Sequence, residues 1–141
     1  HDLPTLKGYW TANDIELRRR LSLYPSDEVR GMVADERVRD RSALVNVLEA
    51  EGLKSAACDA CADSYGQALS LAIHQFLARS SAALVVLQAE DLVGMADPVN
   101  VPGTSDEHAN WQRKMSRDVA AIFGDTEVRR LLDAVQAART R

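Results

Sequence analysis

One short segment, AALVVLQ at residues 82–88, limits most strongly what this sequence can fold into. Residues 82–87 are continuously apolar and β-branched in the middle, a pattern typical of a strand that is buried on both faces. Such a strand must pair its backbone N–H and C=O groups with neighbouring strands on both sides. The sequence holds no second run of comparable quality, so the partners of this predicted strand are not evident in it.

The rest of the sequence is dominated by helical periodicity. A long helix is predicted from Ser26 or Asp27 to about Ala50, because a capping residue precedes its apolar stripe and Gly52 follows it. Further helices are predicted at residues 11–21, 64–77, 117–123 and 125–135, with a short helical turn at 90–94. Residues 96–114 contain two prolines, a glycine and several polar residues, so they are predicted to form a long ordered loop. Loops of that length are usually functional.

A single buried strand among helices is not a complete fold. Either residues 82–87 belong to a helix, or the neighbouring strands lie in polypeptide outside this sequence. The second explanation also accounts for a chain that starts abruptly at His1, without a Met. We therefore expect the 141 residues to be one segment of a larger α/β domain, predominantly helical, with one buried strand.

Charge and hydropathy exclude two classes of partner. The formal net charge of −4 argues against a nucleic-acid-binding protein, which needs a basic face, and the basic run Arg18–Arg20 is expected to face solvent. The longest apolar run, at residues 82–87, is much shorter than the roughly 18 residues of a membrane-spanning helix. We expect neither nucleic acid nor a membrane as a partner.

The two cysteines, Cys58 and Cys61, form a C-x-x-C pair that suits zinc binding or redox chemistry. A structural zinc site needs four ligands, and no second C-x-x-C is present. The other interpretation is a pair of small residues in an Ala-rich connector, reduced in the cytoplasm. We expect the second interpretation, with no metal and no other cofactor, and keep a zinc- or thiol-dependent module as an alternative.

Two motifs and the segment between them carry a resemblance to a known family. HDLPTLKGYW at residues 1–10 is followed by the predicted strand with Gln88, Glu90 and Asp91, and then by VNVPGTSDEHANWQRK at 99–114. In this order and spacing they resemble the C-terminal part of 4-α-glucanotransferases, also called amylomaltases or disproportionating enzymes, of the α-amylase clan. Many members of that family have His-Asp-Asn-Asp where this sequence has His-Asp-Leu-Pro, so details of their sugar subsites are not carried over.

The resemblance implies a fold. The catalytic domain of the family is a (β/α)8 barrel, so residues 1–141 would be its C-terminal segment, from the end of strand seven through the last helices. Residues 82–87 would be strand eight, and the His1-Asp2 dipeptide would lie at the C-terminal end of strand seven. Both motifs would then follow strand ends, where the active sites of such barrels are found.

The resemblance also implies a reaction. Family members transfer α-1,4-glucan chains between maltodextrins with retention of configuration, which requires a nucleophile and an acid/base carboxyl group. Neither of those two residues would lie in this chain, so the segment alone is expected to be inactive. Asp2 would be the third carboxylate, a transition-state stabiliser that accepts hydrogen bonds from sugar hydroxyls, and His1 would bind the same glucose. From the residues alone, without the resemblance, Asp2 would instead form a turn before Leu-Pro, and His1 would be a disordered terminal residue.

The second motif supplies candidate substrate-binding residues. Asn100 and Thr104 offer short hydrogen-bonding groups, and Gly103 allows a close approach of backbone to ligand. A purely structural turn is the alternative for this loop. Glu90 and Asp91 are either site residues or a helix-starting pair that complements the helix dipole. Trp10 and Trp111 either stack on sugar faces or pack in the core.

Together these observations predict a segment of a cytoplasmic 4-α-glucanotransferase. Its expected partners are maltodextrins and the remainder of its own barrel. The main alternative is a free-standing helical interaction or regulatory domain, in which the apolar stripes form only a bundle core.

Overall fold

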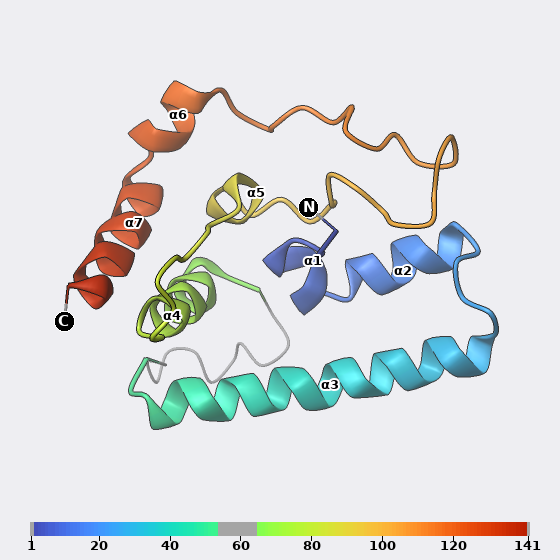
Figure 1. Ribbon diagram of the computed structural model, residues 1–141, viewed down its shortest axis with the longest axis horizontal. Coiled ribbons are helices and arrows are strands. Elements are labelled where there is room, and N and C mark those ends of the chain that lie inside the picture. The colour runs from blue at the N-terminus through green and yellow to red at the C-terminus, as the bar shows by residue number, and fades with distance from the viewer. Residues whose placement is uncertain (1, 54–64, 141) are drawn as a thin grey trace.

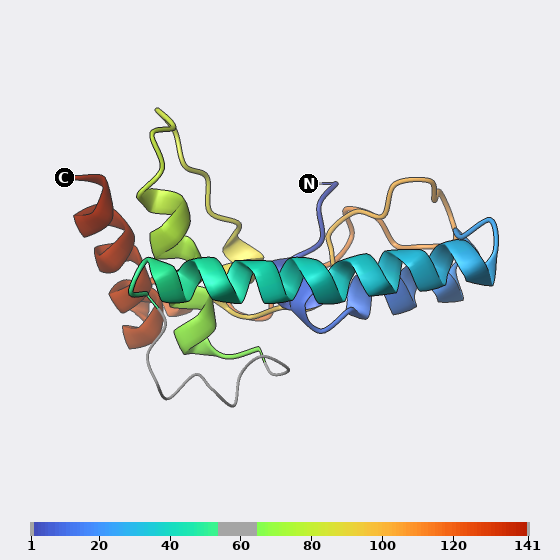
Figure 2. The ribbon, with the colours of Figure 1, turned by 90° about the horizontal axis from the view of Figure 1, so that it is seen from below.

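A computed structural model describes residues 2–53 and 65–140 of the chain. The described residues form seven helices joined by turns and irregular segments (Figure 1). The helices are α1 (Leu6–Trp10), α2 (Asn13–Arg20), α3 (Asp27–Ala50), α4 (Gln67–Ala78), α5 (Ala89–Leu92), α6 (Val119–Gly124) and α7 (Thr126–Arg139). Helix α3 runs along one side of the molecule, with α1 and α2 beside one half of it and α4 near its C-terminal end (Figures 1 and 2). Residues 95–118 return along the opposite side of α1 and α2 without helix.

The core lies where α1, α3 and α4 meet. It is formed by buried apolar side chains, namely Trp10, Leu48, Leu69, Ala72 and Ile73. Helix α4 also packs against α7, which begins at the side-chain cap Asp125, as the sequence predicts. The two sides of α4 therefore connect the N-terminal helices to the C-terminal helix, which explains why α4 is the most apolar of the long helices.

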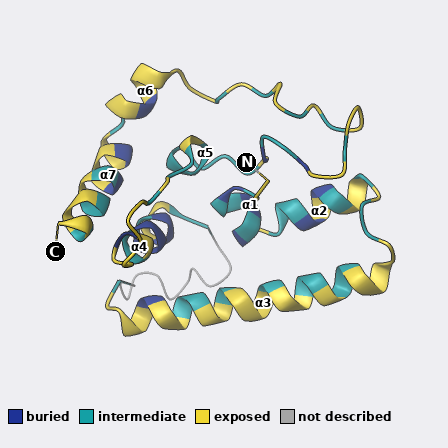
Figure 3. Cartoon of the chain, viewed as in Figure 1, coloured by how far each residue is buried: buried dark blue, intermediate teal, exposed yellow. Residues whose placement is uncertain are grey.

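Helix α3 confirms the predicted long helix at both ends. The hydroxyl of Ser26 accepts a hydrogen bond from the N–H of Val29, and Gly52 follows the last turn with a φ of +65°. Only Leu48 of this helix is fully buried, and most of its surface is exposed (Figure 3). Apolar burial thus fixes only the C-terminal part of α3, and polar contacts must fix the rest.

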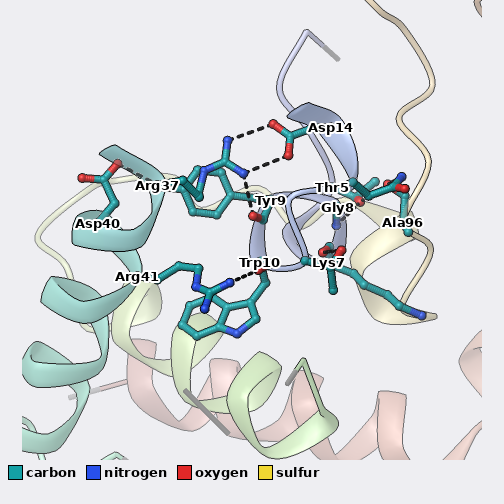
Figure 4. A network of polar contacts seen from close by, with 12 residues as sticks. Thr5, Lys7, Gly8, Tyr9, Trp10, Asp14, Arg37, Asp40, Arg41 and Ala96 are labelled. Atoms are coloured by element: carbon teal, nitrogen blue, oxygen red, sulfur yellow. Dashed lines mark hydrogen bonds and ion pairs between the residues drawn. The ribbon is translucent and has the colours of Figure 1, made fainter. Parts of the chain in front are cut away.

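Two arginines one turn apart on α3 provide those contacts (Figure 4). Arg37 Nη1 donates to the carbonyl of Tyr9 at 2.6 Å, and Arg41 Nη1 donates to the carbonyl of Trp10 at 2.7 Å. Both carbonyls belong to the C-terminal end of α1, where the helix leaves its acceptors without intrahelical partners and favours positive charge. Arg37 also forms a bidentate ion pair with Asp14 of α2. One side chain of α3 therefore holds α1 and α2 together.

The buried strand predicted at residues 82–87 is wrong, and with it the α/β fold class for this segment. Within 2–53 and 65–140 no residue is in a strand, and residues 82–87 form an irregular connection between α4 and α5. Leu84 and Val86 are 76% and 77% exposed. Figure 2 shows this connection extending away from α3. The physical reason is that apolar, β-branched residues make a buried strand only when neighbouring strands satisfy the backbone, and the described residues supply no such neighbour.

Helix α1 was not predicted, since the first helix expected from the sequence starts at residue 11. The helix is short, and the hydroxyl of Thr5 caps it by accepting the N–H of Gly8 at 3.0 Å. Two other helices begin a residue or two from their predicted starts at 11 and 117: Ala12 precedes α2, and Asp118 caps α6. The helix predicted at 64–77 corresponds to α4, and its predicted first residue, Ser64, lies outside the described residues.

Candidate active site

The structure brings together one residue from each of the two motifs that carry the resemblance. The side-chain amide of Asn100 donates to Asp2 Oδ1, with an Nδ2–Oδ1 distance of 2.7 Å. Asp2 precedes α1 and Asn100 follows α5, so neither residue lies on a helix. Both side chains are accessible at the surface. The amide fixes the orientation of the carboxylate and leaves the pair in a position that a solvent-borne ligand can reach.

The loop that holds Asn100 is built around the side chain of Asn110. Asn110 Oδ1 accepts the N–H of Val101 at 2.9 Å, and Asn110 Nδ2 donates to Thr104 Oγ1 at 2.7 Å. Thr104 Oγ1 in turn donates to the carbonyl of Val101 at 2.7 Å. The hydroxyl of Thr104 is therefore engaged within the loop, and Asn110, which sequence reasoning did not single out, closes it.

Gly103 has a backbone reason to be glycine. Its φ of +91° lies in the left-handed region that residues with a Cβ rarely adopt. A Cβ built on this glycine would meet Leu23 Cδ2 at 3.7 Å, which is ordinary contact, so backbone conformation rather than space requires glycine here. The role that the structure itself gives Gly103 is the turn between Asn100 and Asn110.

A second set of contacts joins the N-terminal segment to the segment before Asn100. The Thr5 side chain is almost fully buried, and its hydroxyl donates to the carbonyl of Ala96 at 3.0 Å. Three residues on, the backbone of Gly8 approaches the same carbonyl so closely that a Cβ would lie 2.4 Å from its oxygen. Asn13 Nδ2 donates to Asp97 Oδ1 at 3.2 Å. These contacts bring together residues more than 80 positions apart in the sequence.

Glu90 and Asp91 lie in the first turn of α5, as the helix-starting interpretation predicts, and both also bind other protein groups. Asp91 Oδ1 accepts the backbone N–H of Leu6 at 2.6 Å, and burial raises the pKa of the Asp91 carboxyl above its ordinary value of 3.8. Glu90 Oε1 pairs with Arg113 Nη2 at 3.3 Å, and both side chains are largely buried. Arg113 Nη1 also donates to the sulfur of Met95. Both acids therefore tie α5 to neighbouring segments.

A small cavity of about 50 Å³ lies beside the Asp2–Asn100 pair. Asp14 and Arg18 of α2 line it together with Asp2 and Asn100. Ligand pockets in proteins usually measure about 300–1,000 Å³, so this cavity is too small to be a complete ligand pocket. Sequence reasoning assigned Arg18 to a solvated face, and no local signal places it beside Asp2. A larger cavity of about 510 Å³, between α4, α5 and α7, is lined by neither Asp2 nor Asn100.

The two tryptophans differ sharply in exposure. Trp10 is fully buried in the core, which confirms packing as its role. Trp111 is 60% exposed and has a φ of +63°. Its backbone N–H donates to the carbonyl of Val99, the residue before Asn100. A positive φ is unusual for so bulky a residue.

Other candidate chemistry is not represented in the described part of the chain. His1, Cys58 and Cys61 lie outside it, so the zinc or thiol interpretation of the C-x-x-C pair is not tested. Among residues 2–53 and 65–140, no three His, Cys, Asp or Glu side chains gather as metal ligands would. None of the helices in these two ranges combines the length and the apolar character that a membrane crossing requires.

Comparison with known proteins identifies the family. Residues 1–120 match the family described as 4-alpha-glucanotransferase. The chain is 31% identical over 147 residues to a 4-alpha-glucanotransferase of Haemophilus influenzae, with 99% of this chain and 20% of the relative covered. It is 30% identical over 146 residues to the 4-alpha-glucanotransferases of Mycobacterium bovis and Mycobacterium tuberculosis, covering 99% of this chain and 19% of each relative. The chain thus spans about a fifth of the length of these relatives. The predicted family is confirmed: this chain belongs to the 4-alpha-glucanotransferase family.

Proposed function

We propose that residues 1–141 contribute the C-terminal part of the catalytic domain of a retaining 4-α-glucanotransferase that transfers α-1,4-glucan chains between maltodextrins. Membership of the family supports the reaction class. The observation that carries the proposal for this segment is the hydrogen bond between Asn100 and Asp2, because it joins the two motifs in one accessible place. The proposed partners are maltodextrins and the remainder of the same polypeptide, in the cytoplasm.

In this proposal Asp2 stabilises the transition state. A glucosyl group that loses its leaving group becomes planar and positively charged around its reacting carbon, and the hydrogen bonds to its neighbouring hydroxyls strengthen as it does so. The Asp2 carboxylate accepts such hydrogen bonds, while the Asn100 amide holds its orientation. His1, Gly103 and Thr104 complete the proposed donor-side wall, with Thr104 acting through the loop that it closes with Asn110.

Asp2 alone cannot perform the reaction. Retention of configuration requires a carboxylate nucleophile and a second carboxyl group about 5–5.5 Å away that serves as acid and base. In the proposal these two groups come from polypeptide outside residues 1–141. The cavity of about 50 Å³ beside Asp2 supports this division, since it is much smaller than the roughly 300–1,000 Å³ of a complete ligand pocket.

Disproportionation of maltotriose tests the proposal. The complete product of the gene that encodes this chain should convert maltotriose into glucose and longer maltodextrins, measured by chromatography of the products. The purified segment 1–141 should release no glucose under the same conditions. Failure of the complete gene product to transfer glucan would overturn the proposed function, and turnover by the segment alone would overturn the division of the catalytic groups.

A further inference from the structure

Two irregular segments form the candidate site, and hydrogen bonds join them at both ends. We name residues 2–5 and 96–100 the loop pair. At one end Asn100 Nδ2 donates to Asp2 Oδ1 at 2.7 Å, and at the other Thr5 Oγ1 donates to the carbonyl of Ala96 at 3.0 Å. The backbone of the two segments and these two hydrogen bonds therefore form a closed ring. In such a ring, a displacement of Thr5 or Ala96 also moves Asp2 or Asn100.

Each segment of the loop pair is short and contains a proline. Pro4 lies between Asp2 and Thr5, and Pro98 lies between Ala96 and Asn100. Because the proline ring fixes φ, each segment has few ways to change its length or direction. The position of Asp2 relative to Asn100 consequently depends on where Thr5 and Ala96 are held.

The hydrogen bonds that hold Thr5 and the start of α1 are more deeply buried than the Asp2–Asn100 hydrogen bond. Thr5 is 1% exposed, and its hydroxyl both caps α1 through the N–H of Gly8 and donates to Ala96. One residue further on, the N–H of Leu6 donates to Asp91 Oδ1 at 2.6 Å. Asp91 belongs to α5, so this bond fixes the start of α1 against the helix that leads into the segment of Asn100. The Asp2–Asn100 pair itself is exposed to solvent.

We propose that Thr5 and Asp91 are positioning residues for the glucanotransferase reaction: they touch no substrate, and they set the separation and orientation of Asp2 and Asn100. The inference rests on the proposed function. A misplacement of about 1 Å in a catalytic group can cost roughly a hundredfold in rate. Since the bonds of Asp2 to the sugar strengthen in the transition state, the loss falls on kcat more than on KM.

Paired substitutions in the complete gene product test this role. Asp91→Ala removes the acceptor of the Leu6 N–H, whereas Asp91→Asn retains a side-chain oxygen at the same place. Thr5→Val removes both the donor to Ala96 and the acceptor of the Gly8 N–H with little change in shape, whereas Thr5→Ser retains the hydroxyl for both bonds. We expect Asp91→Ala and Thr5→Val to lower kcat for maltotriose about tenfold to a hundredfold, with KM changed less than about threefold. Asp91→Asn and Thr5→Ser should keep kcat within about threefold.

A double-mutant cycle separates positioning from a general loss of folding. If Asp91 acts through Asp2, then in an Asp2→Asn background the further change Asp91→Ala should lower the residual kcat by less than about twofold. A merely structural effect would lower kcat by the same factor in both backgrounds. Asp133→Ala, which removes an exposed acid from α7, is the matched control and should leave kcat unchanged.

The outcomes distinguish the two proposals. Assays run well below the melting temperature of each variant, with near-UV circular dichroism as the check of folding. A normal kcat in a folded Asp91→Ala enzyme would overturn the positioning role while the proposed function stands. The same fold loss of kcat from Asp91→Ala in the wild-type and Asp2→Asn backgrounds would do so too. A wild-type gene product that transfers no glucan would overturn the proposed function and this inference with it.

Discussion

Asn100 donates a hydrogen bond to Asp2 across 98 positions of the sequence, with 2.7 Å between Nδ2 and Oδ1. The amide is a neutral donor that matches a carboxylate acceptor. Asn100→Ala removes this donor, and we expect kcat of the complete gene product to fall about tenfold. Asn100→Asp should lower kcat further, because a second carboxylate at this distance repels the charge of Asp2 and supplies no amide donor. Steady-state kinetics of both variants against pH measures the difference.

The contrast between the two variants decides the interpretation. If Asn100→Ala and Asn100→Asp lower kcat equally at every pH, the amide serves the fold of the loop and not the charge of Asp2. Asp106→Asn, at an exposed position of the same loop, is the control and should keep the wild-type rate.

Gly8 allows a backbone contact that no other residue fits. A Cβ there would lie 2.4 Å from the carbonyl oxygen of Ala96 and 3.0 Å from Thr5 Oγ1. Gly8→Ala should therefore destabilise the protein by about 1–3 kcal/mol, because backbone must shift to make room. Gly31→Ala is the matched control: no atom lies within 4 Å of its Cβ position in the interior of α3, so it should stabilise by about 0.5–1 kcal/mol. Thermal unfolding of the two variants should move in opposite directions, and equal shifts would contradict the close approach.

Arg37 holds the N-terminal helices together through contacts that are largely buried. The side chains of Arg37 and Asp14 are 10% and 14% exposed, and the guanidinium lies 3.6 Å from the ring centroid of Tyr9. Arg37→Met leaves the Asp14 carboxylate without its partner and should cost about 3 kcal/mol. Arg30→Met breaks an exposed pair with Asp27 and should cost no more than about 0.5 kcal/mol.

Hydrogen exchange of the α1 and α2 amides measures the effect of the two arginine variants. Arg37→Met should speed exchange in both helices, and Arg30→Met should not. Unchanged protection in Arg37→Met would show that α1 and α2 do not depend on this side chain.

Asp91 and Asp125 should respond to pH with opposite signs. Burial raises the pKa of Asp91, so the folded protein binds this proton more tightly than the unfolded chain does. The contribution of Asp91 to stability therefore falls as pH rises from below 3.8 through the raised pKa. Asp91→Asn should raise the melting temperature at pH 7, and the gain should vanish in acid.

For Asp125 the hydrogen bond from Arg117, helped by the N–H groups of Glu127 and Val128, lowers the pKa. Its stabilising contribution is present above the ordinary pKa of 3.8 and is lost as pH falls through the lowered value. Asp125→Asn should thus lower the melting temperature at pH 7, with a difference that shrinks in acid. Melting curves from pH 3 to pH 7 test both signs, and a common sign for the two variants would contradict these assignments.

The parts of the fold that could be predicted are those determined by neighbouring residues. Ser26 and Asp125 cap helices through hydrogen bonds to N–H groups two or three residues away, which a local pattern reveals. The apolar run at 82–87 was interpreted wrongly, because whether such residues form a strand depends on partners distant in the sequence. Helix α1 was missed because a five-residue helix with one cap gives no periodic signal.

In the candidate site, too, some residues could be identified from the sequence, but the contacts between them could not. Asp2 and Asn100 were found through the family resemblance, and no pattern in the sequence predicts that their side chains touch. The bonds from Thr5 to Ala96 and from Leu6 to Asp91 join positions 91 and 85 residues apart. Such pairings depend on how the whole chain brings α1 and the segment around α5 together, which local propensity does not encode.

The most direct test of the account is kcat of the Asp2→Asn variant of the complete gene product with maltotriose as substrate. The substitution keeps the shape of the side chain and an oxygen that can accept the hydrogen bond from Asn100. It removes the negative charge beside the reacting sugar. We predict a loss of about a thousandfold in kcat, corresponding to about 4 kcal/mol of transition-state stabilisation, with a much smaller change in KM. A folded Asp2→Asn enzyme that turns over maltotriose at the wild-type rate would contradict the account.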